Sequence, residues 1–305
     1  MSEAPRLVRA ERLGSPARSK PSSREVLRVA AVQHRWHLDP AEHESALETA
    51  VRMAAEEGAR LICLQELTLS PYFAVDPNGG GDHAEAIPDG RTSRWALRLA
   101  KETGAHVHAS LYEQSQDGGL GYDTAIVAAP SGSIVARTRK LHIPGGTGYH
   151  EDRYFRPGAP ADAYPVIEVE GGRFGFPTCW DQWFPELARI YSLRGAEVIV
   201  YPSAIGSEPD HPDFDSEPQW EAVIVANGIM NGTFMVVVNR IGIEGPLTFY
   251  GSSFISDPFG RKLVQAPRDA PAVLIADLDL DLRRDWLDLF PLLKARRPEA
   301  YGPLV

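Results

Sequence analysis

One cysteine stands where the sequence changes character. Residues 173–178 are an apolar run of strand type, Cys179 follows, and a helical pattern begins at Asp181 with Pro185 and Glu186 in its first turn. A thiol between a strand and a helix start lies near unpaired backbone N–H groups and the positive end of the helix dipole. Both features lower the pKa of a thiol and can hold an oxyanion, so Cys179 is a candidate nucleophile. A buried structural cysteine is the alternative, and this segment alone leaves both open.

Two charged residues stand at the ends of other apolar strand patterns. The run 61–65 ends next to Glu66, and a strand pattern that starts at Ser133 ends at Lys140. A carboxylate beside the thiol can take its proton and pass it to a leaving amine, provided that desolvation keeps the carboxyl pKa near the working range. A lysine adds positive charge where an oxyanion develops, a contribution of about 2–4 kcal/mol for a typical oxyanion donor. The alternative for both residues is a surface ion pair.

A glutamate, a lysine and a cysteine at strand ends, in this chain order, resemble the nitrilase superfamily of carbon–nitrogen hydrolases. The resemblance covers the chain from about Val26 to its end. The segments that carry it are Gln65-Glu66-Leu67 with Pro71-Tyr72-Phe73, Lys140-Leu141-His142-Ile143-Pro144, residues 179–186, and Asn239-Arg240-Ile241-Gly242. Three independent motifs in the right order and spacing make a chance match very improbable.

The resemblance implies roles for single residues. Cys179 would be the nucleophile, Glu66 the general base and acid, and Lys140 the oxyanion stabiliser. The backbone N–H of Trp180 would be a second oxyanion donor, and Glu151 matches the second glutamate of the family, which positions the substrate. The reaction expected of such a site attacks an amide-type carbonyl, releases ammonia or an amine, and hydrolyses a thioester-type acyl-enzyme. No metal and no other cofactor is expected.

Within the superfamily, several segments look most like N-carbamoylputrescine amidases, which convert their substrate and water to putrescine, ammonia and carbon dioxide. These segments are residues 179–186, 204–209, 248–255 and 296–304. The residues expected to bind substrate are Tyr72, Trp180, Asp181, Ala204 and Glu208.

The segment after the cysteine also bears on the substrate. Relatives that hydrolyse N-carbamoyl amino acids tend to have arginines here, whereas Gln182 and Trp183 cannot form a charged fork to a carboxylate. Asp181 or Glu208 would suit an ammonium group, although Asp181 could equally cap the following helix. A β-ureidopropionase or aliphatic amidase of the same superfamily is the alternative enzyme, and a catalytically silent binding subunit is the alternative of another class.

Composition narrows the class of protein. A chain of 305 residues suffices for one large domain, and no apolar run approaches membrane-spanning length. The N-terminus lacks the apolar segment of a secretion signal, and two cysteines make no disulfide framework, so a cytoplasmic location is expected. The net charge of −10 argues against a nucleic-acid partner and is compatible with a cationic substrate. We expect a small-molecule substrate, no membrane partner and, from the resemblance, a homo-oligomer.

Strand and helix patterns alternate along the chain, which predicts an α/β fold that is largely one domain. Residues 1–25 lack apolar periodicity and are predicted to be a disordered tail, and residues 26–305 a single domain. The long loop 68–90, with a glycine-rich tip at 78–82, is expected to border the substrate. Residues 249–256 and 262–265 are predicted to pair as a hairpin. The resemblance implies a four-layer αββα sandwich, with a C-terminal extension from about Arg283 that packs across a subunit interface.

Overall fold

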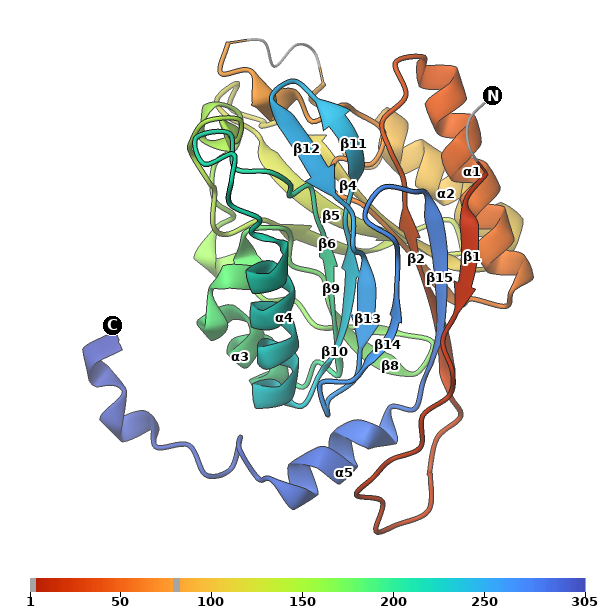
Figure 1. Cartoon of the computed structure of the whole chain (residues 1–305), viewed down its shortest axis with the longest axis vertical. Coiled ribbons are helices and arrows are strands. Elements are labelled where there is room, and N and C mark those ends of the chain that lie inside the picture. The colour runs from red at the N-terminus through yellow and green to blue at the C-terminus, as the bar shows by residue number, and fades with distance from the viewer. Residues whose placement is uncertain (1–3, 79–82, 305) are drawn as a thin grey trace.

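Two β-sheets lie face to face at the centre of the structure (Figure 1). The computed structural model describes residues 4–78 and 83–304. One sheet has the strand order β1-β15-β2-β3-β4-β5-β6 and the other β14-β13-β10-β9-β8-β7. The strands of the first sheet are β1 (Arg6–Arg9), β2 (Leu27–Gln33), β3 (Leu61–Leu64), β4 (His106–Glu113), β5 (Tyr122–Ala128), β6 (Ile134–Arg139) and β15 (Ala272–Leu278). Those of the second are β7 (Ile167–Val169), β8 (Gly172–Gly175), β9 (Val198–Pro202), β10 (Phe234–Val238), β13 (Phe254–Ser256) and β14 (Lys262–Gln265).

The alternation of side chains along the strands separates three apolar layers. In β2, Val29 and Ala31 point into the core between the sheets, where Val236 of β10 also lies. Ala30 and Val32 point to the opposite face and pack with the helices that cover it. Because both faces of the strand are covered, the sequence reads as a continuous apolar run.

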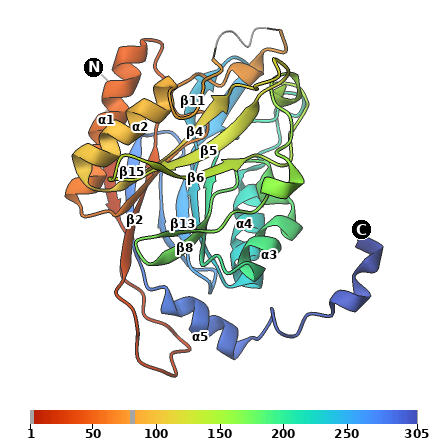
Figure 2. The same ribbon diagram turned by 180° about the vertical axis from the view of Figure 1, so that it is seen from behind.

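Helices cover the outer face of each sheet. α1 (Pro40–Glu56) and α2 (Arg91–Thr103) pack on the first sheet, and α3 (Pro185–Leu193) and α4 (Glu217–Asn231) pack on the second (Figures 1 and 2). The start of α1 follows from its sequence, since Asp39 accepts a hydrogen bond from the Ala41 N–H and Pro40 occupies the first turn. The order helix, sheet, sheet, helix confirms the predicted four-layer αββα sandwich.

The N-terminal segment differs from the disordered tail that we expected over residues 1–25. Strand β1 adds to the edge of the first sheet in parallel with β15, and Leu7 and Val8 pack against its two faces. Arg18 then binds Asp279 and Asp285 at 2.6 and 2.9 Å. The open edge of β15 and these ion pairs order a stretch whose composition shows no apolar periodicity. Residues 1–3 of the expected tail lie outside the described residues.

Two further predictions need correction. Residues 249–256 do not form one strand: β12 (Leu247–Tyr250) pairs with β11 (Ile241–Glu244) in a separate hairpin, and only β13 pairs with β14. The chain bends between them at Gly251 and Ser252, both at positive φ. The tip at 78–82 lies largely outside the described residues, and the part of its loop around Tyr72 is followed by a short 3-10 helix, η1 (Phe73–Val75).

The chain ends in helix α5 (Asp281–Leu289) and a segment that leaves the body of the molecule (Figure 1). α5 stays attached because the indole of Trp286 donates to the carbonyl oxygen of Ile229 at 2.8 Å. The departing segment therefore starts after Leu289, a few residues later than Arg283. None of the helices described in residues 4–78 and 83–304 is long and apolar enough to cross a membrane.

Candidate active site

Glu66 lies immediately after β3 and is completely buried. The chain turns sharply here, with Leu67 in the left-handed backbone region at φ 49°. The guanidinium of Arg240 donates to the carbonyl oxygens of Glu66 and Leu67 at 2.9 and 3.0 Å. Because a left-handed leucine is strained, this external clamp is what holds the turn that aims Glu66 inward.

Lys140 follows β6 and is also completely buried. Its backbone N–H donates to the Asp123 carbonyl oxygen at 2.9 Å, which extends the β5–β6 ladder by one residue. Its Nζ donates to Glu66 Oε1 at 2.9 Å and to Glu151 Oε2 at 2.5 Å. Sheet pairing thus brings the ends of β3 and β6 together, although 74 positions separate Glu66 from Lys140 in the chain.

Glu151 reaches the same point from a loop. It is buried at the start of the 3-10 helix η2 (Glu151–Arg153), and its Oε1 accepts a hydrogen bond from the Tyr72 hydroxyl at 2.8 Å. Both oxygens of Glu151 are therefore held, one by Tyr72 and one by Lys140. Tyr72 contacts Glu151 and is not among the residues that line the cavity described below, so the structure places it behind the site rather than against a substrate.

Cys179 lies at a tight bend between β8 and the helical region that follows. Strand β8 ends at Gly175, three residues earlier than predicted, and the Cys179 N–H donates to the Pro202 carbonyl oxygen at the end of β9 at 2.9 Å. The next residue, Trp180, has φ 67°, which is unusual for a bulky side chain and is typical of strained functional turns. A 3-10 helix, η4 (Asp181–Trp183), then precedes α3. The bend projects the sulfur out of the sheet toward Glu66, Lys140 and Glu151, whose charges all act on it.

The thiol is not ionised at rest, contrary to the sequence-based expectation of a lowered pKa. Burial raises the pKa of Cys179 well above its usual value, and the charge of Glu66 raises it further. The ammonium of Lys140 and the Ala204 N–H favour the thiolate but do not outweigh these effects. Desolvation is the reason: a buried sulfur loses the hydration that would stabilise its charge.

Burial also shifts the two glutamates toward neutral pH. It raises the pKa of Glu66 to about 8 and that of Glu151 to about 7, with Lys140 opposing the shift in each case. For Lys140 itself, burial lowers the pKa, but the charges of Glu151, Glu66 and Asp123 raise it well above its usual value. The site thus combines a fixed ammonium with carboxyl groups that can exchange protons near neutrality.

A cavity of about 230 Å³ opens onto the sulfur. Cys179 and Glu151 lie at its inner end, and Trp180, Ala204 and Glu208 line it as predicted. Its remaining lining consists of Pro144, Gly145, Gly146, Thr147, Tyr149, Ile205, Pro209, Asp210 and His211. Lysine and arginine are absent from this lining, so its fixed charges on the outer side are the carboxylates of Glu208 and Asp210.

Asp181 does not join the other predicted substrate-binding residues. It is buried, and its carboxylate accepts hydrogen bonds from the His142 N–H at 3.0 Å and from the Thr178 N–H at 3.3 Å. The His142 ring also lies 2.7 Å from it through Nδ1. Asp181 therefore ties the segment after Lys140 to the bend at Cys179, and neither of its predicted roles, substrate contact or helix cap, matches this geometry.

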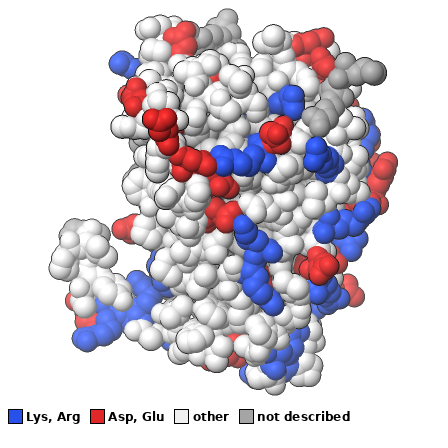
Figure 3. All heavy atoms as spheres, viewed as in Figure 1, with Lys and Arg blue, Asp and Glu red and all other residues white. Residues whose placement is uncertain are grey.

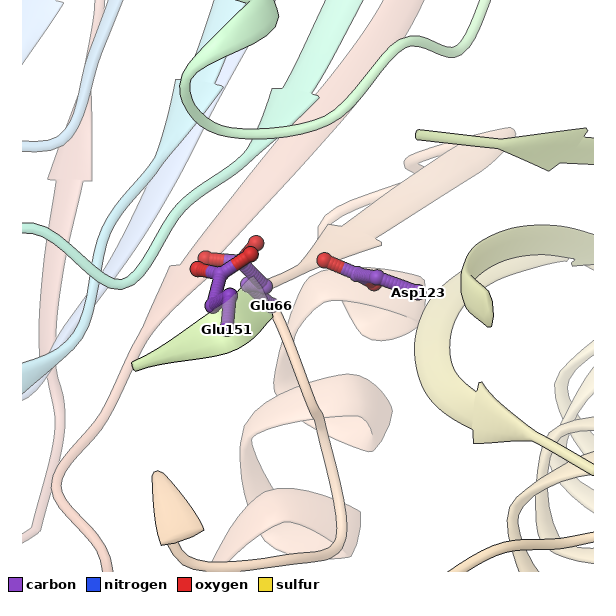
Figure 4. A group of neighbouring side chains, drawn as sticks. All are labelled: Glu66, Asp123 and Glu151. Atoms are coloured by element: carbon purple, nitrogen blue, oxygen red, sulfur yellow. The ribbon is translucent and has the colours of Figure 1, made fainter. Parts of the chain in front are cut away.

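Sequence reasoning missed Asp123, which lies beside the site in β5. Its carboxyl group and those of Glu66 and Glu151 approach within 4.8 Å of one another and point together (Figure 4). The ammonium of Lys140 lies within 3.5 Å of all three and supplies the positive charge at this point. A charged residue in an otherwise apolar strand was the available signal, and it was overlooked because Asp123 belongs to none of the motifs.

Comparison with known proteins agrees with this geometry. The sequence profile described as carbon–nitrogen hydrolase matches residues 28–288. The chain is 36% identical to a citrullinase of Francisella tularensis, over 92% of this chain and 98% of the relative. It is 35% identical to the N-carbamoylputrescine amidase of Arabidopsis thaliana, over 92% of this chain and 96% of the relative.

Solved structures agree as well. A carbon–nitrogen hydrolase of Helicobacter pylori superposes with a TM-score of 0.82 at 30% identity, covering 92% of this chain and 98% of that one. An amidase from Nesterenkonia sp. superposes with a TM-score of 0.75 at 26% identity, covering 92% and 98%, and was solved with the acetamide moiety of fluoroacetamide added covalently at its active-site cysteine. The chain described here thus belongs to the carbon–nitrogen hydrolase family of the nitrilase superfamily, enzymes that act on non-peptide carbon–nitrogen bonds.

Proposed function

We propose that this enzyme hydrolyses N-carbamoylputrescine through a covalent intermediate on Cys179. The observation that carries the proposal is the cavity itself. Its inner end holds the thiol beside Glu66, Lys140 and Glu151, and its outer part has carboxylates but no arginine or lysine. A ureido group at the inner end and an ammonium group at the outer end match this distribution of charge.

The reaction begins with a proton transfer. Because the thiol is protonated at rest, Glu66 takes its proton as the sulfur attacks the ureido carbon. The oxygen of that carbonyl gains the negative charge, which the Lys140 ammonium and the Trp180 N–H stabilise. Glu66 then returns the proton to the departing ammonia, and a carbamoyl thioester remains on Cys179.

Water completes the cycle. Glu66 accepts a proton from a water molecule that attacks the thioester carbon, and the sulfur leaves and regains a proton. The released carbamic acid decomposes to putrescine and carbon dioxide, so one substrate and one net water yield putrescine, ammonia and carbon dioxide. Glu151, fixed by Tyr72 and Lys140, positions the ammonium of Lys140 and the substrate.

Citrulline is the second candidate, because a relative of comparable identity is named citrullinase. Citrulline shares the ureido group and a distal ammonium with N-carbamoylputrescine but adds a carboxylate. That carboxylate would meet Glu208 and Asp210 without an arginine or lysine in the cavity lining. Like charges in a partly desolvated pocket repel, so the cavity favours the substrate without a carboxylate.

Ammonia release from a substrate panel tests the proposal. The panel holds N-carbamoylputrescine, citrulline, N-carbamoyl-β-alanine and a simple aliphatic amide, with C179A as the inactive control. We expect the highest kcat/KM for N-carbamoylputrescine, by at least about tenfold over either carboxylate-bearing compound. Preference for citrulline or N-carbamoyl-β-alanine would refute the substrate, and turnover by C179A would refute the mechanism.

A further inference from the structure

Asp123 is a buried carboxyl group to which the reaction above gives no task. It lies near the start of β5, almost without solvent exposure. The register of the sheet places it there, since Tyr112 of β4 is its direct partner on one side and the Lys140 N–H binds its carbonyl oxygen on the other. Its side chain points at Glu66 (Figure 4).

One oxygen of Asp123 has a donor and the other does not. Oδ1 accepts a hydrogen bond from the Ser110 hydroxyl at 3.0 Å, and that hydroxyl oxygen accepts from the Leu67 N–H at 3.1 Å. Oδ2 lies 3.5 Å from Lys140 Nζ and has no hydrogen-bond donor within residues 4–78 and 83–304. Oε2 of Glu66 is equally without one. Ionised carboxylates only accept, so these two buried oxygens satisfy each other only if a proton lies between them.

The balance of charge favours such a proton. Three carboxyl groups, those of Glu66, Asp123 and Glu151, gather around the single ammonium of Lys140 in a region closed to solvent. A buried charge without compensation is costly, and a carboxyl group in that position takes up a proton instead. Burial raises the pKa of Asp123, although Lys140 opposes the rise.

Of the pair, Glu66 is the better placed to be ionised. Its Oε1 accepts a charge-assisted hydrogen bond from Lys140 at 2.9 Å, whereas Asp123 has a neutral hydroxyl on one oxygen and the ammonium only at 3.5 Å from the other. Charge-assisted hydrogen bonds are about twice as strong as neutral ones, so the negative charge is more stable on Glu66.

We propose that Asp123 is protonated and donates a hydrogen bond from Oδ2 to Oε2 of Glu66, as a positioning residue that favours and orients the ionised base facing Cys179. The proton stays on Asp123 while Glu66 exchanges protons with the thiol, the leaving group and water. The charged or titratable groups that face Asp123 are Glu66 after β3, Lys140 after β6 and Glu151 in η2. The inference rests on the proposed hydrolysis at Cys179 but not on which ureido or amide compound is the substrate.

The two states of Asp123 shift the pH dependence in opposite directions. A protonated Asp123 lowers the pKa of Glu66 by donating to it, so its loss moves the acid limb of kcat/KM to higher pH. An ionised Asp123 would raise the pKa of Glu66, so its loss would move that limb to lower pH. The sign of the shift therefore identifies the protonation state.

The experiment compares Asp123→Asn with Asp123→Ala from about pH 5 to about pH 10. Asparagine keeps a donor toward Glu66 and an acceptor for Ser110. We expect D123N to keep kcat within about threefold of wild type, with the acid limb moved by less than about 0.3 pH unit. We expect D123A to lose at least about tenfold in kcat, with little change in KM and an acid limb about one unit higher. Asp288→Asn, at an exposed aspartate in α5, is the matched control.

A second measurement needs no substrate. The rate at which iodoacetamide alkylates Cys179, followed by mass spectrometry across the same pH range, reports directly on the thiol and its base. It should follow the same order, with D123N near wild type and D123A slower. An acid limb of D123N displaced by a full unit in either direction overturns the proposal, and this variant decides the matter even if D123A does not fold. Failure of the substrate panel, by contrast, would leave the alkylation result intact.

Discussion

At the scale of single residues, burial controls the chemistry of the site. The nucleophile candidate is a buried thiol whose pKa is raised, and its neighbour Glu66 is a buried carboxyl with a pKa near 8. Neither group is reactive by itself, because the thiol needs a base and the base needs a fixed cation to stay ionised in a dry environment. The unit that can act is the thiol, the carboxylate and the Lys140 ammonium together.

The raised pKa of Glu66 has a consequence for stability. A free glutamate titrates near pH 4.3, whereas Glu66 in the folded protein titrates near 8. Between these values the folded state holds a proton that the unfolded chain has released, so the wild-type free energy of unfolding falls as pH rises from about 4.5 to 8. Glutamine does not titrate, and E66Q should therefore gain stability relative to wild type over this range. Urea unfolding at pH 5 and pH 8 measures it.

The control for this prediction is C179A, which retains Glu66 and should follow the wild-type trend. A difference between E66Q and wild type that is the same at pH 5 and pH 8 would show that Glu66 titrates normally in the folded protein.

Glu208 lies at the outer part of the cavity and is held by the Ser216 hydroxyl, which donates to its Oε1 at 2.9 Å. Glu208→Gln keeps the shape but removes the charge. We expect KM for N-carbamoylputrescine to rise about tenfold, with kcat nearly unchanged, because an attraction of the ammonium group common to ground and transition states is lost. Steady-state ammonia release measures both constants.

A neutral analogue provides the control for Glu208. n-Butylurea has the same ureido group without the ammonium, so its kcat/KM should be nearly equal in E208Q and wild type. Glu168→Gln, at an exposed position in β7, should leave both substrates unaffected. A similar loss for n-butylurea and N-carbamoylputrescine would mean that Glu208 shapes the cavity rather than recognises charge.

At the scale of secondary-structure elements, the site lies where strand ends from both sheets meet. β3 and β6 of the first sheet deliver Glu66 and Lys140, and the bend after β8 in the second delivers Cys179. Arg240, between β10 and β11, links the two sheets: it donates to the turn after β3 and pairs with Glu244 at 2.7 Å. Glu244 in turn accepts from the Tyr72 N–H at 2.7 Å.

Removal of Arg240 should therefore cost both stability and activity. Arg240→Leu leaves Glu244, which is largely buried, without its cation and releases the strained turn at Leu67. Breaking a buried ion pair from one side costs about 3–5 kcal/mol, and we expect a loss of this size in the free energy of unfolding from urea titration. kcat should also fall, because Glu66 is no longer aimed at the sulfur.

The double variant R240L/E244Q separates charge from clamping. It should recover part of the lost stability, because the unpaired carboxylate is gone, but not the lost kcat. Full recovery of kcat in the double variant would argue against a positioning role for the Arg240 clamp.

At the scale of the whole molecule, the C-terminal segment extends away from the body that holds the site (Figure 1). Phe290, Leu292 and Leu304 are exposed along it. The face of the molecule shown in Figure 3 carries acidic and basic side chains interspersed rather than in separate patches. An apolar segment that leaves a mixed-charge surface is suited to packing on another subunit, and we propose that it joins copies of this chain in a homo-oligomer.

Deletion of residues 290–305 tests that proposal. We expect the full chain to be an oligomer by size-exclusion chromatography with light scattering, and the truncated chain to be a smaller species that stays folded because α5 and both sheets remain. Leu38→Ser, at an exposed leucine in the body of the molecule, should leave the mass unchanged. A monomeric full chain, or an unchanged mass after deletion, would contradict the proposal.

Local signals in the sequence were enough for the family and the fold. Apolar runs such as β2 reveal strands covered on both faces, and the motifs around Glu66, Lys140 and Cys179 identified the superfamily that the comparisons confirm. The family's motifs are local because each is a strand end with its following turn, so they survive in a single sequence. The catalytic roles of these residues stay predictions, now with a geometry that brings them together.

Tertiary structure decided what depends on neighbours distant in the chain. It ordered the N-terminal segment against the edge of β15, turned Asp181 into a tie between loops, and placed Asp123 and Arg240 at the site. It also reversed the expected pKa shift of Cys179, because desolvation in a packed interior outweighs the local backbone dipoles that the sequence reveals. Burial is a property of the folded whole, and for that reason the type of each site residue was readable from the sequence while its protonation state was not.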